Sequence, residues 1–85
     1  MSKTYKEAIT EETETTINVL YGEKILSLYT NKVDLQRKLN KILGEPTYEH
    51  KKGKNIMSSR WDIPLSEKSK ISQIMLKADI FEIMN

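Results

Sequence analysis

The segment TINVLYGEKILSLYT, residues 16–30, can pair with itself as an antiparallel hairpin. With Gly22 and Glu23 as a two-residue loop, four apolar residues fall on one face of the pair. They are Ile17, Val19, Leu26 and Leu28. The register that closes the loop is therefore also the register that forms a core, with Val19 opposite Leu26. Glycine at the first loop position predicts a type II′ turn, which needs a positive φ there.

The opposite face of this hairpin carries apolar residues among polar ones. They are Leu20, Ile25 and Tyr29. We expect them to form an exposed apolar cluster, which either contacts a partner protein or is covered by the C-terminal tail.

Residues 31–43 follow a helical pattern with both ends marked. Asn31 is a suitable N-cap, and Gly44 followed by Pro46 ends the helix, with Gly44 left-handed. The apolar stripe consists of Leu35, Leu39, Ile42 and Leu43.

Residues 47–65 predict a second hairpin that turns around Gly53. Apolar and polar residues alternate beyond the turn, which places Trp61 and Ile63 on the core face. Pro64 marks the end of the strand or a sheet edge, because it cannot donate to a ladder.

A second helix is predicted after Ser66, its expected N-cap. Its apolar stripe is Ile71, Ile74, Met75 and Ala78. Residues 80–84 fit either a continuation of this helix or a short strand.

The element order is therefore ββα-ββα, which predicts an α+β fold. We expect two layers, with an antiparallel sheet and both helices on one of its faces. Residues 1–12 are polar and lack periodicity, so they predict a mobile N-terminal arm or a frayed helical turn, and residues 13–85 form a single α+β domain.

Composition excludes several classes of protein. The absence of cysteine excludes disulfides, thiolate metal sites and a cysteine nucleophile, and it favours a reducing, cytoplasmic location. The first residues lack the apolar core of a signal peptide, and no run approaches the roughly 18 apolar residues of a membrane span. A chain of 85 residues has modest stability unless it forms oligomers, so a homo-oligomer stays open.

The sequence carries no recognisable catalytic constellation. For its single histidine, His50, the sequence suggests neither a nucleophile nor a residue that would orient the imidazole. We interpret His50 as a solvated strand residue. The carboxylates lack metal-ligand spacing, and the glycines are explained by turns and a helix end rather than by a phosphate loop. We therefore expect no enzyme activity, no metal and no cofactor.

The net charge of +2 is unevenly distributed, because residues 31–60 hold eight basic and three acidic residues. The candidate phosphate-binding residues are Arg37, Lys38, Lys41, Lys51, Lys52, Lys54 and Arg60. If they converge on one side, a groove for nucleic acid results, with Tyr48 or Trp61 available to stack on a base. The alternative interpretation is a solvated helix face and an ordinary turn.

Two stretches of the chain carry a resemblance to known proteins. They are TTINVLYGEKILSLYTNKVDLQRKLNKILGEP and SRWDIPLSEKSKIS. Their pattern resembles small uncharacterised proteins of phages and mobile elements of low-GC bacteria. The resemblance covers about residues 14–76 and includes no functional motif. It implies a non-enzymatic binder of a larger protein, and in its sharpest form an anti-CRISPR-like inhibitor of a nucleic-acid-guided host nuclease. Inhibitors that mimic DNA are strongly acidic, and this chain at +2 is not.

Two function hypotheses follow. The first is a protein-binding module that uses Leu20, Ile25 and Tyr29 to occupy a surface of a larger protein. The second is a nucleic-acid-binding accessory protein that uses the basic segment 37–60.

Overall fold

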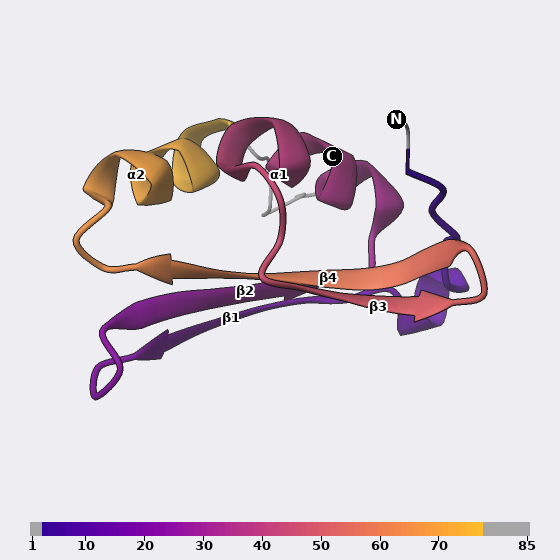
Figure 1. The fold of residues 1–85 in the computed structure, drawn as a ribbon, viewed down its shortest axis with the longest axis horizontal. Coiled ribbons are helices and arrows are strands. Elements are labelled where there is room, and N and C mark those ends of the chain that lie inside the picture. Colours follow the sequence, from indigo (N-terminus) through magenta and orange to yellow (C-terminus); the bar gives the residue numbers. More distant parts are fainter. Residues whose placement is uncertain (1–2, 78–85) are drawn as a thin grey trace.

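The computed structural model describes residues 3–77, which form an α+β fold. A four-stranded antiparallel sheet forms one layer, and two helices cover one of its faces (Figure 1). The elements are η1 (Thr10–Glu12), β1 (Thr15–Leu20), β2 (Ile25–Thr30), α1 (Val33–Leu43), β3 (Tyr48–Lys52), β4 (Asn55–Pro64) and α2 (Lys68–Lys77). The short 3-10 turn η1 lies ahead of the first strand, within residues 1–12, for which a mobile arm or a frayed helical turn was predicted.

The strands lie in the order β1-β2-β4-β3, so each hairpin contributes one edge strand and one central strand. The predicted register of the first hairpin is confirmed, with Leu20 opposite Ile25 and Val19 opposite Leu26. The two hairpins join through β2 and β4, where Leu28 lies opposite Trp61. The register between β3 and β4 shifts after His50, which marks a bulge.

The turn of the first hairpin differs from the predicted type II′. The amide of Lys24 donates to the carbonyl of Tyr21 at 3.2 Å, so Gly22 and Glu23 do occupy the centre of the turn. The positive φ, however, falls on Lys24 at 59° and not on Gly22. A left-handed residue after the turn is typical of hairpin connections longer than two residues.

The core lies between the sheet and the helices. Its buried members are Leu26, Leu28, Leu35, Leu39, Trp61, Ile63 and Ile74. Trp61 is a core residue, as predicted, and its indole N–H donates to the carbonyl of Gly44 at 3.0 Å. Ile17 packs against this core, but Val19 is 41% exposed, which corrects the expectation that it is a core residue. Its strand, β1, lies at the sheet edge.

Helix α1 ends at Gly44, the predicted residue, although Gly44 is not in the left-handed helical conformation, and the start of the helix differs from the prediction. Gly44 has a φ of 85°, and its amide donates to the carbonyl of Asn40. The N-cap position belongs to Lys32, not Asn31, and no N-cap side-chain bond is made there. The Asn31 side chain instead accepts from the amide of Glu14 and donates to the carbonyl of Glu12. It therefore ties the start of β1 to the end of β2.

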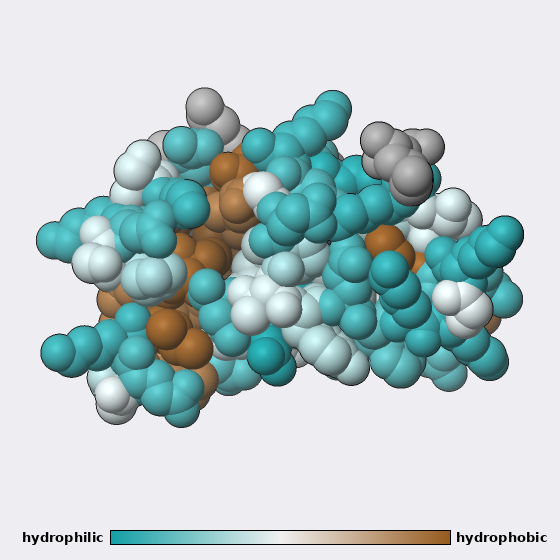
Figure 2. Space-filling model, viewed as in Figure 1, coloured by the Kyte–Doolittle hydropathy of each residue, from teal (hydrophilic) through white to brown (hydrophobic). Residues whose placement is uncertain are grey.

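Helix α2 begins at Lys68, two residues after the predicted cap Ser66. Ile74 is buried and Ile71 packs against the core, whereas Met75 is exposed, contrary to prediction. Ala78 and residues 80–84 lie outside the described residues. Apolar side chains reach the surface at the α2 end of the molecule, between the helix layer and the strands (Figure 2).

Residues 3–7, here called the N-terminal strap, belong to the segment that was predicted to be a mobile arm. Tyr5 forms a parallel bridge with Ile56 at the start of β4. The amide of Ile56 donates to the carbonyl of Thr4 at 2.7 Å, and the amide of Lys6 donates to the carbonyl of Ile56 at 3.1 Å. The strap therefore follows the edge of β4 beyond the point where β2 ends.

Candidate functional site

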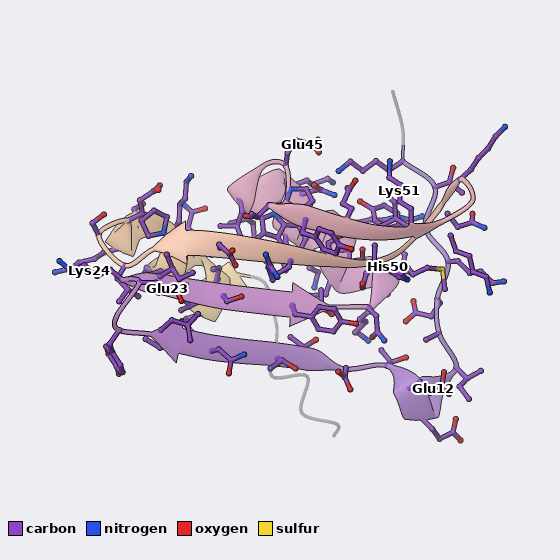
Figure 3. All side chains as sticks on the ribbon, turned by 60° about the horizontal axis from the view of Figure 1, so that its bottom comes forward. Glu12, Glu23, Lys24, Glu45, His50 and Lys51 are labelled. Carbon is purple, nitrogen blue, oxygen red and sulfur yellow. The ribbon has the colours of Figure 1, made fainter. Side chains whose placement is uncertain are left out.

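The sheet face opposite the helices is the first candidate site. Figure 3 turns this face toward the reader, with the four strands in front of the helices. Alternation along β2 sends Leu26 and Leu28 to the core and Ile25 and Tyr29 to the open face. Residues opposite one another on neighbouring strands share a face, so three cross-strand rows can be followed over it.

One of these rows contains the aromatic side chains. Thr16, Tyr29, Arg60 and Tyr48 lie opposite one another across β1, β2, β4 and β3. The Arg60 guanidinium lies over the Tyr48 ring, 5.7 Å from its centroid, which is within the range of a cation–π contact. The Nε of Arg60 is also 3.3 Å from a carboxylate oxygen of Asp62. We call Tyr29, Arg60 and Tyr48 the aromatic row.

The three residues predicted to bind a protein do not form one cluster. Leu20 and Ile25 lie opposite each other and next to Pro64 in one row. Tyr29 belongs to the aromatic row, about 13 Å away along β2 at the usual rise per residue. The row between them is polar, and consists of Asn18, Ser27 and Asp62. Leu20 is 38% exposed, while Ile25 and Tyr29 are half-buried.

The seven predicted phosphate-binding residues are divided among three places. Arg37, Lys38 and Lys41 lie on α1, in the helix layer. Arg60 is on the open sheet face, and Lys51, Lys52 and Lys54 lie at the end of the β3–β4 hairpin. The structure therefore does not bring these cations together in one groove.

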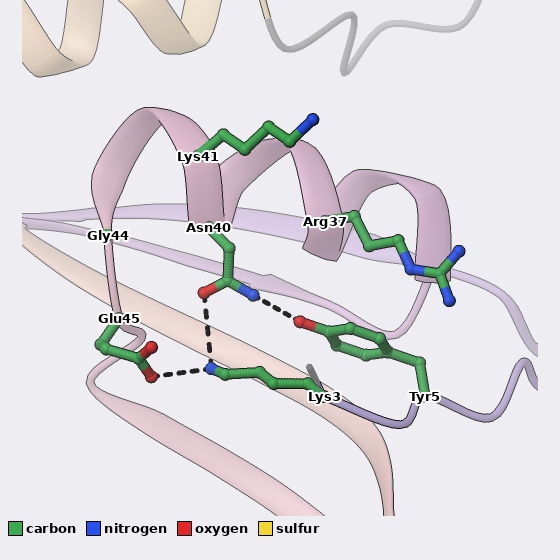
Figure 4. A pocket seen from close by; sticks show the side chains of 7 residues that line it. All are labelled: Lys3, Tyr5, Arg37, Asn40, Lys41, Gly44 and Glu45. Atoms are coloured by element: carbon green, nitrogen blue, oxygen red, sulfur yellow. Dashed lines mark hydrogen bonds and ion pairs between the residues drawn. The ribbon is translucent and has the colours of Figure 1, made fainter. Parts of the chain in front are cut away.

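A second candidate site lies between the strap and the C-terminal half of α1 (Figure 4). It is an open cavity of about 700 Å³. Its lining residues are Lys3, Tyr5, Arg37, Asn40, Lys41, Gly44 and Glu45. Strap side chains that alternate along the backbone point into this region, and helix α1 with the loop after it supplies the rest.

The Lys3 ammonium is the most highly coordinated charge of this cavity. Its Nζ lies 2.7 Å from Oε1 of Glu45, 2.5 Å from Oε2 of Glu49 and 3.5 Å from the side-chain oxygen of Asn40. Burial alone lowers the pKa of Lys3, but the hydrogen bonds and negative charges of the two glutamates outweigh it. The pKa is therefore raised above its ordinary value of 10.5.

Tyr5 occupies the next inward position of the strap. Its hydroxyl accepts a hydrogen bond from the amide nitrogen of Asn40, and the Arg37 guanidinium lies 5.4 Å from its ring centroid. Burial raises the pKa of the Tyr5 phenol above its ordinary value of 10.0, although the charges of Lys3 and Arg37 oppose this.

Sequence reasoning missed the three strap residues whose side chains contact the rest of the molecule. They are the half-buried Lys3 and Tyr5 and the exposed Glu7, and their positions are called the inward positions. Their alternate spacing, K-x-Y-x-E, is a period-2 pattern and was the signal available. It was too short and too polar to predict a strand. His50, the only histidine, is exposed on β3, where it lies opposite Ser58.

Residues 3–77 form a small α+β domain in which no described helix or strand covers the sheet face opposite α1 and α2. Comparison with protein-family models, with curated proteins and with solved structures finds no match to this chain. Across residues 3–77, no helix is long and apolar enough to cross a membrane. Within the same range, no group of three or more histidine, aspartate or glutamate side chains is placed to hold a metal ion.

Proposed function

We propose that this protein is a small non-enzymatic binding module that docks on a larger protein through its open sheet face. The observation that carries the proposal is the aromatic row. Tyrosine and arginine are the residue types that most often anchor protein interfaces, and here they stand side by side on a broad surface opposite the helices. Tyr48 is 54% exposed, so much of its ring is available to a partner.

The two ends of this face differ in character, which favours a protein partner. The aromatic row supplies anchors with polar tips, and the row of Leu20, Ile25 and Pro64 supplies apolar area. An anchor cluster with apolar and polar surroundings is the usual composition of a protein interface. The narrower proposal, an inhibitor of a nucleic-acid-guided defence nuclease, rests on the resemblance to phage and mobile-element proteins alone.

The same aromatic row supports a second candidate function, binding of single-stranded nucleic acid. Exposed aromatic side chains on an antiparallel sheet can stack on bases, and arginine adds a charge for phosphate. In this case the cations that would take part are Arg60 and the hairpin lysines Lys51, Lys52 and Lys54. The cations of α1 lie in the other layer and would not contribute.

Affinity capture from a bacterial lysate, with and without nuclease treatment, separates the two functions. We expect a captured protein that survives nuclease treatment, and Tyr29→Ala to weaken its binding about 30-fold, or about 2 kcal/mol. Tyr21→Ala is the matched control, because Tyr21 lies in the hairpin turn and is 79% exposed. It should bind normally.

Replacing Lys51, Lys52 and Lys54 together with Gln tests the second function. A protein partner should still bind this variant almost normally. Nucleic-acid binding predicts that nuclease treatment abolishes capture and that the lysine variant loses it. The slope of log affinity against log salt concentration should also become flatter by about one unit per lost contact, and these results would establish nucleic-acid binding. They would refute the protein-docking proposal.

A further inference from the structure

The N-terminal strap binds the rest of the molecule as a peptide ligand binds a sheet edge. Its backbone contacts β4 through two hydrogen bonds, both made with Ile56. Addition of a strand to a free sheet edge is a common mode of peptide recognition, in which main-chain bonds give affinity and alternate side chains give specificity. The strap supplies the partners of the Ile56 amide and carbonyl, so removal of the strap leaves both groups at a free edge where another extended segment can bond them.

The side-chain contacts of the strap fall at alternate positions, as strand addition requires. Lys3 lies between Glu45 and Glu49, which come from the loop after α1 and from β3. Tyr5 reaches Asn40 of α1. These two positions therefore favour a basic residue followed by an aromatic one.

Glu7 supplies the third position. Its carboxylate accepts a hydrogen bond from the amide of Val33 at 3.0 Å. Val33 is the first residue of α1, where backbone amides lack partners within the helix and a negative charge is favoured. The carboxylate of the strap therefore acts as a cap of this helix from 26 residues away.

The strap fills this site incompletely. Thr4 and Lys6, between the inward positions, are exposed. The contacts of the inward positions are polar, except for the half-buried Tyr5 ring, and a cavity of about 700 Å³ stays open beside it. A segment held by polar contacts over a sheet edge is of the kind that opens locally without global unfolding.

We propose that the edge of β4 at Ile56, with Glu45, Glu49, Asn40 and the start of α1, is a strand-addition site. The partner is an extended peptide segment of another protein with a basic, an aromatic and an acidic residue at alternate positions. The strap occupies the site in cis and competes with that segment. This site is separate from the open sheet face, so the inference does not rest on the proposed docking function.

The test uses a fluorescent peptide of residues 2–8, SKTYKEA, added to the full chain. The full chain carrying Lys3→Ala and Tyr5→Ala has a weakened strap. It should bind the peptide at least about tenfold more tightly than the unsubstituted chain, because the competitor in cis is weaker. Lys6→Ala is the matched control, since Lys6 points outward, and it should bind like the unsubstituted chain.

Adding Glu49→Gln to the strap-weakened chain should reduce peptide affinity, because Glu49 pairs with Lys3 of the strap and the lysine of the peptide takes the same place. A peptide in which Tyr is replaced by Ala should bind weakly to every chain. Equal peptide affinity for the unsubstituted and strap-weakened chains, or no effect of Glu49→Gln, would overturn the proposal.

Hydrogen exchange tests the same inference in the unsubstituted chain, which does not depend on the folding of a variant. The Ile56 amide should exchange at least about tenfold faster than the amides of the central strand β2, because opening of the strap frees it while β2 stays paired. Excess peptide should slow this exchange. Exchange of Ile56 at the rate of β2, with no response to peptide, would refute the site.

Discussion

Gly44 shows how one residue determines where an element ends. Its φ of 85° with a ψ of −156° lies in a region that glycine alone adopts readily, rather than in the left-handed helical region. Its amide donates the last hydrogen bond of α1 to the carbonyl of Asn40, and its carbonyl accepts a hydrogen bond from the indole N–H of Trp61. The backbone of this one residue therefore joins the helix end to the core.

We predict that Gly44→Ala destabilises the protein by about 1–3 kcal/mol, because alanine resists this backbone conformation. A methyl group there would meet no neighbouring atom within 4 Å, so any loss comes from the backbone and not from a clash. Gly22→Ala is the matched control. It also meets nothing within 4 Å and lacks a positive φ, so the change should stay within about 0.5 kcal/mol. Urea unfolding measures both, and equal losses would contradict the prediction.

Among single residues, those with local signals were predicted well. Gly44 and Pro46 end a periodic stretch, and Trp61 alternates with Ile63, so neighbouring residues carried enough information. Asn31 is a residue type that often caps helices, but the prediction that it caps α1 was wrong. Its side-chain amide instead forms hydrogen bonds with the backbone of Glu12 and Glu14. A side chain with two available partners cannot be assigned from its own stretch of sequence.

At the scale of elements, the first hairpin is best tested on one cross-strand row. Val19, Leu26 and Ile63 lie opposite one another, but Leu26 is buried and Val19 is exposed. We predict that Leu26→Asp abolishes cooperative unfolding, because it buries an unpaired carboxylate in a small domain. Val19→Asp should retain a cooperative transition, since its side chain reaches water. Circular dichroism during heating measures both, and a Leu26→Asp melt close to that of the parent would exclude this packing.

The hairpins could be predicted from sequence because each pairs residues close in the chain. The exposure of Val19 could not, because it depends on which strand becomes the edge of the sheet. The strap could not be predicted either, since Lys3 meets Asn40, Glu45 and Glu49 across 37 to 46 residues. For the same reason the open face was predicted only in part, as Tyr29 joins Arg60 and Tyr48 only once β2 pairs with β4.

At the scale of the whole molecule, the strap links parts that are distant in the chain. It contacts β4, both ends of α1 and the start of β3. Its two perturbed groups, Lys3 and Tyr5, both have a raised pKa. Each therefore holds its proton more tightly in the folded chain than in the unfolded one.

This linkage predicts a loss of stability at alkaline pH. The contribution of both groups is fully present below pH 10.0, the ordinary pKa of tyrosine, and is lost as the pH rises through their folded values. A chain with Lys3→Met and Tyr5→Phe should show a smaller decline in stability than the parent as the pH rises above 10.0. Urea unfolding midpoints over that range measure the difference, and parallel declines would count against the linkage.

The strand order has a consequence for self-association. Strands β1 and β3 are the two ends of the sheet, but they differ in charge. The sequence of β3, YEHKK, carries charged side chains that discourage another strand from pairing with its free edge, whereas β1, TTINVL, carries none and is rich in β-branched residues. At high concentration we therefore expect aggregation to begin at β1, where a single charged substitution such as Val19→Lys would suppress it.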